Sequence, residues 1–258
     1  MPTQHVPDEF VRLATRLAED AHGYLRDAFP RRGEVEIKPD GTPVTPFDRG
    51  LEERLRGILA REAPSHGVRG EEFGAENADA EWVWVLDPID GTKAFLTGKP
   101  TFGSLIALAH ERVPVLGVIE CPMTDERWIG GEGVPTRTGA GPTRVRDPRA
   151  LEDCVMYGYH TFHMEPDRRA GLDRLRRAVR FPVHDTDCFG YGRLASGDID
   201  LVVEPGLAVH DHAALAPVVR GAGGTLTLFD GSTPTIDAGG DIIAATSPEV
   251  ARAALALL

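Results

Sequence analysis

The stretch Trp82-Val83-Trp84-Val85-Leu86-Asp87-Pro88-Ile89-Asp90-Gly91-Thr92 decides how this 258-residue chain folds. Its first five residues form a continuous apolar run, which predicts a strand buried on both faces. The following turn carries two carboxylates three residues apart, with a proline between them that restricts the backbone. These carboxylates can converge on one point, where the Ile89 carbonyl can join them. Oxygen ligands of this kind suit Mg²⁺.

The end of the same stretch predicts a turn that binds phosphate. Gly91 has no side chain, so an anion can approach the backbone amides there. A helix beginning near Thr92 would add free N–H groups and its dipole. The alternative is an ordinary turn capped by an aspartate, which is common for an isolated Asp-Gly-Thr sequence. The full six-residue string after an apolar strand favours the metal and phosphate site.

Helical and strand patterns alternate on both sides of this stretch. Apolar residues at three- and four-residue steps predict a helix over 10–28, which Pro30 ends, and another over 51–58, which Pro64 ends. Residues 105–109 and 115–119 predict a hairpin. In the second half, we expect helices over 168–180, 188–195, 212–222 and from Ser247 onward, and strands over 199–203, 225–229 and 242–245. Interleaved elements predict an α/β (α+β) fold of layered sheets covered by helices.

Between residues 130 and 148 the composition shifts to Gly, Pro, Thr and Arg. We interpret this segment as the junction between two halves, 1–135 and 136–258. The first half would carry most of the metal ligands. The second half would carry the last ligand and the residues that recognise the substrate.

Bulk composition limits the classes of function. Hydrophobic residues make up 41% and charged residues 26%, which is typical of globular proteins. A net charge of -12 disfavours binding to nucleic acid or to anionic membranes, and an acidic protein that acts on phosphate esters needs bound cations. The 3 cysteines argue against a disulfide framework or a four-ligand zinc site. No stretch resembles a secretory signal or a membrane span, so we expect a cytoplasmic protein.

Further acidic residues stand at informative positions. Glu71 lies in an acidic pair between two glycines, Asp48 follows Thr45 at helix-capping spacing, and Asp211 precedes an apolar helix. Each has an ordinary alternative, because acidic pairs are often solvated and single aspartates often cap helices. The histidines that flank Asp211 also suggest zinc, but adjacent residues rarely face one ion. The order of these residues along the chain is more informative than any one of them.

Between about Lys38 and Gly224, three features in this order resemble the inositol monophosphatase superfamily. They are the acidic pair at Glu71, the string from Asp87 to Thr92, and Asp211 before a helix that ends in Gly-Ala-Gly-Gly. This superfamily contains lithium-sensitive, Mg-dependent phosphatases. The resemblance implies a layered αβαβα sandwich of the inositol monophosphatase/fructose bisphosphatase type, usually a homodimer. It also implies two or three Mg²⁺ ions per site.

The resemblance implies a role for each matching residue. Ligands of the first metal ion would be Glu71, Asp87 and the Ile89 carbonyl, and ligands of the second would be Asp87, Asp90 and Asp211. Asp48 and Thr92 would orient the attacking water, and either this pair or Glu71 would accept its proton. The Gly91 and Thr92 amides would hold the phosphate. A phosphoaspartate enzyme of the haloacid-dehalogenase type is excluded, because Pro88 stands where its nucleophile would be.

Two carboxylates point to the substrate. Glu204 lies seven residues before Asp211, where the superfamily typically places a carboxylate that meets a substrate hydroxyl or amine. Asp187 stands where inositol phosphatases tend to have a small residue, and residues 187–217 are similar to the histidinol-phosphate phosphatase branch. Paired carboxylates suit a cationic amine and an imidazole N–H. The alternative for Asp187 is a helix N-cap.

We therefore expect hydrolysis of L-histidinol phosphate, a small phosphate monoester, in histidine biosynthesis. Other substrates in the same superfamily are inositol 1-phosphate, fructose 1,6-bisphosphate and 3′-phosphonucleotides. A non-catalytic binding protein on the same scaffold is disfavoured, because all four carboxylate ligands and Thr92 are present. His210 replaces an aromatic residue usual in several branches, and the sequence leaves its role open, as it does for His212.

Overall fold

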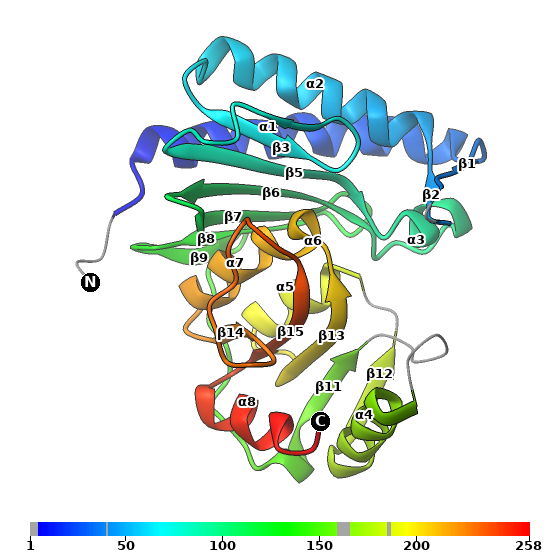
Figure 1. Ribbon diagram of the computed structural model, residues 1–258, viewed down its shortest axis with the longest axis vertical. Coiled ribbons are helices and arrows are strands. Elements are labelled where there is room, and N and C mark those ends of the chain that lie inside the picture. The colour runs from blue at the N-terminus through cyan, green and yellow to red at the C-terminus, as the bar shows by residue number, and fades with distance from the viewer. Residues whose placement is uncertain (1–4, 40, 159–165, 185–186) are drawn as a thin grey trace.

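Two long helices, α1 (Asp8–Ala28) and α2 (Pro46–Glu62), cover one face of a large sheet (Figure 1). The computed structural model describes residues 5–39, 41–158, 166–184 and 187–258. Helix α1 ends in a short 3-10 turn that contains Pro30, as the sequence predicts. Helix α2 begins with the expected capping box, in which Thr45 and Asp48 bond to each other's backbone N–H groups.

The large sheet has eight strands in the order β10-β9-β8-β7-β6-β5-β3-β4. Their bounds are β3 (Gly67–Gly70), β4 (Gly74–Glu76), β5 (Trp82–Asp90), β6 (Gly103–His110), β7 (Val113–Cys121), β8 (Glu126–Gly131), β9 (Val134–Thr138) and β10 (Gly141–Pro142). The predicted hairpin is confirmed as β6 and β7. Strand β5 is buried on both faces, since Trp84 and Leu86 pack toward α1 and α2 while Val83 and Val85 pack on the opposite side.

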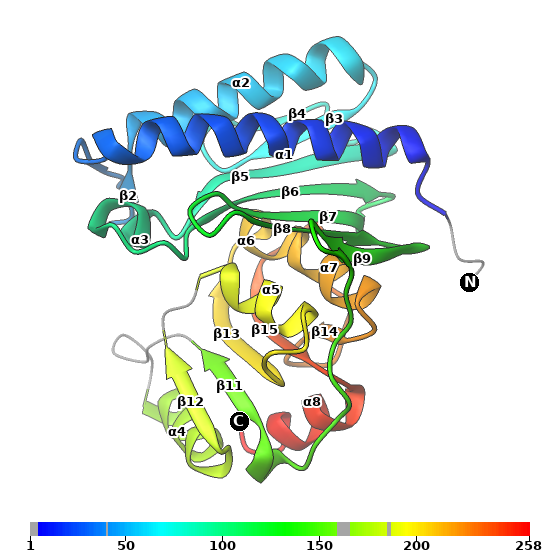
Figure 2. The same ribbon diagram turned by 180° about the vertical axis from the view of Figure 1, so that it is seen from behind.

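Three short helices fill the space between this sheet and a second one (Figure 2). They are α5 (Phe189–Ala195), α6 (Val209–Ala213) and α7 (Leu215–Gly221). The expectation of a single helix over 212–222 is wrong in detail, because the helix begins at Val209 and is divided at Ala214. Pro217 has no N–H to donate to the carbonyl four residues earlier, which interrupts the helical bonding there.

The second sheet has five strands in the order β12-β11-β13-β15-β14. Their bounds are β11 (Val155–Gly158), β12 (Phe181–His184), β13 (Leu201–Leu207), β14 (Thr225–Leu228) and β15 (Gly240–Ala245). Helices α4 (Pro166–Ala178) and α8 (Pro248–Leu255) cover its outer face. Ser247 caps α8 by accepting the Val250 N–H, as predicted. The five layers confirm the αβαβα sandwich (Figures 1 and 2).

The glycine-rich segment after residue 130 is more regular than its composition suggests. Strands β9 and β10 lie in it, so the first sheet continues to Pro142 before the chain crosses to the second sheet. Short polar strands at a sheet edge lack the alternating apolar pattern that identifies longer strands. The division of the chain at residues 135 and 136 stays a prediction. In the described part of the chain, no helix combines the length and the apolar character that crossing a bilayer requires.

The first half of the chain also contains a two-stranded ribbon and a short helix. Strands β1 (Glu36–Ile37) and β2 (Pro43–Val44) pair antiparallel to each other. Helix α3 (Thr92–Thr97) follows β5 directly, so the prediction of a helix beginning near Thr92 is confirmed.

Candidate active site

The parallel pairing of β3 with β5 brings Glu71 beside Asp87. Gly70 is in register with Leu86, and the Glu71 N–H donates to the Leu86 carbonyl at 3.2 Å. Side chains at the carboxyl ends of neighbouring parallel strands emerge at the same edge of a sheet. Asp90 lies three residues after Asp87 on β5. The pairing of β5 with β6 is irregular between these two residues.

Asp211 reaches this edge from the other half of the molecule. It lies in the first turn of α6, where its Oδ2 accepts the Ala208 N–H at 2.6 Å. Carboxylate oxygens of Asp87, Asp90 and Asp211 all lie within 4.8 Å of one another. Atoms of Glu71, Asp87 and His210 form a second such group. The structure therefore brings together the four carboxylates that the sequence proposes as ligands, although their binding of metal stays a prediction.

The chemistry of this cluster fits a divalent cation. The side chain of Asp87 is buried, and its Oδ1 has no hydrogen-bond partner among the described residues. Burial raises the pKa of Asp87 well above the ordinary value, and the charges of Glu71 and Asp90 raise it further. The pKa of Asp90 and that of Asp211 are also raised, first by burial. Buried carboxylates need a compensating cation, and a group of hard oxygen ligands suits Mg²⁺.

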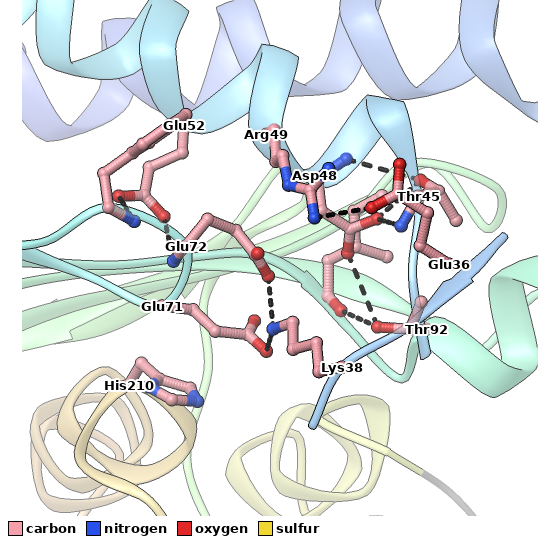
Figure 3. A network of polar contacts seen from close by, with 12 residues as sticks. Glu36, Lys38, Thr45, Asp48, Arg49, Glu52, Glu71, Glu72, Thr92 and His210 are labelled. Atoms are coloured by element: carbon pink, nitrogen blue, oxygen red, sulfur yellow. Dashed lines mark hydrogen bonds and ion pairs between the residues drawn. The ribbon is translucent and has the colours of Figure 1, made fainter. Parts of the chain in front are cut away.

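Lys38 supplies part of the missing positive charge. Its Nζ donates to Oε1 of Glu71 at 2.8 Å and to Oε1 of Glu72 at 2.6 Å (Figure 3). Burial lowers the pKa of Lys38, but the hydrogen bonds to the two glutamates outweigh burial and leave the pKa raised. No role for Lys38 could be predicted, because its only signal in the sequence is that of a basic residue in the polar loop before Thr45.

Glu52 is a second residue that sequence reasoning missed. Its carboxylate is fully buried on α2 and accepts the N–H groups of Glu72 at 2.7 Å and Phe73 at 3.2 Å, together with Nε of Arg56 at 2.8 Å (Figure 3). A Cβ at Gly70 would lie 1.9 Å from Glu52 Oε1, so a side chain at this position would displace the buried Glu52 carboxylate. Glu52 thereby fixes the turn that carries the predicted ligand next to Gly70.

The turn after β5 has the geometry expected of a phosphate seat. Gly91 has a φ of +78°, a left-handed conformation in which a side chain is disfavoured, and it stands at the N-cap of α3. The Thr92 hydroxyl lies 3.2 Å from the Ile89 carbonyl and 3.5 Å from Asp48 Oδ1 (Figure 3). Burial raises the pKa of Asp48 to about 6, against the lowering effect of its bonds to Thr45. Asp48 thus caps α2 and also faces Thr92.

A cavity of about 380 Å³ opens beside these groups. Predicted ligands, phosphate-seat residues and both predicted substrate carboxylates line it, namely Glu71, Asp87, Ile89, Asp90, Gly91, Thr92, Asp187, Glu204 and Asp211. Cys188 is the N-cap of α5, so the alternative that Asp187 caps this helix is wrong. Asp187 has a φ of +50°, accepts the Thr101 hydroxyl at 2.5 Å and lies 3.9 Å from Lys99 Nζ.

The hydroxyl of Tyr191 holds Glu204 in the cavity wall. Tyr191 is fully buried, and its hydroxyl donates to Glu204 Oε2 at 2.9 Å. Burial raises the pKa of Tyr191, which keeps the phenol protonated and able to donate. Tyr191 therefore belongs to the core and also supports Glu204 in the cavity wall.

Comparison with known proteins identifies the family of the chain. The model of the inositol monophosphatase family matches residues 6–258. Bifunctional phosphatase IMPL2, chloroplastic, of Arabidopsis thaliana is 38% identical over 96% of this chain and 74% of its own length. A histidinol-phosphatase of Mycobacterium tuberculosis is 37% identical over 85% of this chain and 87% of its own. A solved inositol monophosphatase from Zymomonas mobilis has a TM-score of 0.89 and 37% identity, covering 98% of this chain and 99% of that one. The chain belongs to the inositol monophosphatase family.

Proposed function

We propose that this protein is a Mg²⁺-dependent phosphomonoesterase that hydrolyses L-histidinol phosphate to L-histidinol and phosphate. The observation that carries the proposal is the convergence of Asp87, Asp90 and Asp211 from two halves of the chain around one point. Glu71 and the Ile89 carbonyl would complete the ligand set. Two or three Mg²⁺ ions held there would neutralise the phosphate dianion and lower the pKa of the attacking water.

The proton of that water has a defined route through the chain. The Thr92 hydroxyl can receive the proton while passing its own to Asp48 Oδ1, 3.5 Å away. With a pKa of about 6, Asp48 is deprotonated near neutral pH yet basic enough to accept it. Glu71 is the other candidate base. The donation from Lys38 Nζ to Glu71 Oε1 occupies that oxygen and favours the route through Thr92.

Substrate choice rests on two carboxylates at different distances from the phosphate seat. The Asp187 carboxyl lies directly against Gly91, since a Cβ there would be 2.7 Å from Asp187 Cγ. In histidinol phosphate the ammonium group stands on the carbon next to the phosphate-bearing carbon, so it would fall beside Asp187. Glu204, whose Oε2 accepts the Tyr191 hydroxyl, would accept the imidazole N–H of the substrate. A neutral polyol would gain less from these two charges.

Inositol 1-phosphate is the second candidate substrate. The Zymomonas mobilis inositol monophosphatase shares the same 37% identity with this chain as the Mycobacterium tuberculosis histidinol-phosphatase does. Fructose 1,6-bisphosphate and 3′-phosphonucleotides are weaker candidates, and a non-catalytic binding role is weaker still. The family resemblance further supports a homodimer, and the unpaired cysteines Cys121, Cys154 and Cys188 support a cytoplasmic location.

The test compares kcat/KM for L-histidinol phosphate and inositol 1-phosphate in the presence of Mg²⁺. Because a site built for hydrogen-bonding groups strongly rejects substrates that lack them, we expect a preference of at least about 100-fold for histidinol phosphate. Chelation of the metal should abolish both activities. Equal kcat/KM values for the two substrates would reject histidinol phosphate as the preferred substrate but would not reject the phosphatase activity. Failure to release phosphate from either substrate and from p-nitrophenyl phosphate would reject the phosphatase.

A further inference from the structure

His210 lies at the edge of the acidic cluster, one residue before Asp211 in the first turn of α6. A ring nitrogen of His210 and carboxylate oxygens of Glu71 and Asp87 all lie within 4.8 Å of one another. Figure 3 shows the imidazole rising from α6 toward Glu71. The ring is partly buried, and its Nε2 stands 3.5 Å from Asp211 Oδ1.

His212 is directed elsewhere, which shows that the histidines on either side of Asp211 differ in role. A helix turns by about 100° per residue, so side chains two positions apart point to nearly opposite sides. His212 is fully buried, its Nε2 lies 3.3 Å from the Ala238 carbonyl, and burial lowers its pKa. His212 is therefore part of the packing, and His210 is the histidine that faces the acidic cluster.

The cluster around His210 has a surplus of negative charge and an incomplete set of partners. Asp87 is buried with its Oδ1 unbonded to any described residue. A neutral imidazole offers a donor atom to a cation without adding another negative charge to this corner. Imidazole nitrogen also differs in kind from the carboxylate and carbonyl oxygens of the other ligands, since it suits Mn²⁺, Co²⁺ and Zn²⁺ better than Mg²⁺.

We propose that His210 is a nitrogen ligand of the divalent ion held by Glu71 and Asp87. This proposal rests on the proposed metal-dependent activity and extends it to metal choice. The ion position shared with Glu71 then has mixed nitrogen and oxygen ligands, while the position formed by Asp87, Asp90 and Asp211 has oxygen ligands alone. The mixed position binds Mn²⁺ in preference to Mg²⁺ by a larger factor than the oxygen-only position does.

The test uses Mn²⁺ as a spectroscopic probe of the whole protein after removal of bound metals. Electron spin echo spectra of bound Mn²⁺ detect coupling to a directly coordinated nitrogen. The spectra would be recorded for the wild type, for His210→Gln and for His22→Gln. His22 is a suitable matched control, because it lies on α1 and contacts Glu120 away from the cavity. Affinities for Mn²⁺ and Mg²⁺ would be measured by titration on the same three proteins.

The wild type and His22→Gln should show nitrogen coupling, and His210→Gln should lose it. The affinity for Mn²⁺ should fall about 10-fold or more in His210→Gln, as expected when a metal site loses a supporting group, and the affinity for Mg²⁺ should fall by a smaller factor. Two results would overturn the proposal and leave His210 as a partner of Asp211. One is nitrogen coupling that persists in His210→Gln, and the other is an equal loss of affinity for Mn²⁺ and for Mg²⁺. If Mn²⁺ binds and supports hydrolysis without nitrogen coupling, the role of His210 alone fails. If neither Mn²⁺ nor Mg²⁺ binds to the wild type, the proposed metal-dependent activity fails as well.

Discussion

The backbone N–H of Cys188 donates to Oδ2 of Asp90 at 2.6 Å. This bond joins the start of α5, in the half that carries Asp187, to the end of β5, in the half that carries most of the predicted ligands. The carboxylate of Asp90 is thus bonded to the half that carries Asp187, and one of its oxygens lies within 4.8 Å of oxygens of Asp87 and Asp211. The predicted metal ligands and the cavity wall near Asp187 are therefore linked through this carboxylate.

Asp90→Asn should therefore impair catalysis more than stability. The amide keeps the shape of the side chain but removes the negative charge from the proposed ligand set. Losing groups that merely support a metal site costs about 10- to 100-fold, so we expect kcat/KM to fall by at least about 100-fold. The concentration of Mg²⁺ for half-maximal activity should rise. Asp79→Asn, on an exposed loop, is the control, and unchanged Mg²⁺ dependence in Asp90→Asn would remove Asp90 from the metal site.

Asp187→Ala should change substrate preference. Without this carboxylate beside Gly91, kcat/KM for histidinol phosphate should fall by about 10- to 100-fold, because the ammonium group loses its charged partner. The value for inositol 1-phosphate should stay within about threefold, by the same reasoning. Asp187→Asn is the matched control, since it can keep the hydrogen bond with Thr101 while losing the charge. Equal losses on both substrates would show that Asp187 does not discriminate between them.

Glu52→Gln should act through the position of Glu71. The glutamine places an NH₂ group among the N–H donors of Glu72 and Phe73, which costs about 1–3 kcal/mol in the free energy of unfolding. We expect the Mg²⁺ concentration for half-maximal activity to rise about 10-fold or more, while kcat at saturating Mg²⁺ changes little. Glu53→Gln, an exposed neighbour on α2, is the control. Lower stability with normal Mg²⁺ dependence would limit Glu52 to a structural role.

Removal of divalent metals should destabilise the protein more at higher pH. The carboxyls of Asp87, Asp90 and Asp211 have an ordinary pKa of 3.8 and a raised pKa in the fold. Below the ordinary value they are protonated in both the folded and unfolded states, so burial costs little. As the pH rises above it, the unfolded chain loses these protons first, and the metal-free fold becomes less stable until the raised pKa values are passed.

Bound cations reverse this loss, because they bind the deprotonated carboxylates. The increase in Tm that Mg²⁺ gives over EDTA should thus be larger at about pH 8 than at about pH 5.5. Thermal unfolding with and without EDTA measures it directly. An increase in Tm that is the same at both pH values would mean that these carboxylates do not take part in binding.

The local part of the site could be predicted from the sequence. The strand at β5, the turn after it and the helix at Thr92 depend on neighbouring residues, and all three are confirmed. The convergence of Glu71 and Asp211 on Asp87 depends on strand pairing and sheet docking, which no local pattern encodes. Only the family resemblance linked them. Short strands such as β3 and β12 were missed because they have too few apolar residues for a pattern.

The missed residues show the same limit. Lys38 and Glu52 take their roles from partners 33 and 20 residues away along the chain. Glu52 looks like an exposed helix carboxylate until the turn after β3 is folded against α2. Burial of a charged residue is a tertiary property, and its cause lies in the contacts that compensate the charge.

The centre draws on residues separated by more than half of the chain, since Glu71 follows β3 and Asp211 belongs to α6. During synthesis, a ribosome-bound chain that has released only the first sheet would hold three of the four carboxylates and no functional pocket. Cation capture would have to await the docking of α6 against that sheet. Under the proposed function, metal binding would stabilise the packing of α6 against the first sheet, and hydrolysis would begin only in molecules in which both sheets are folded.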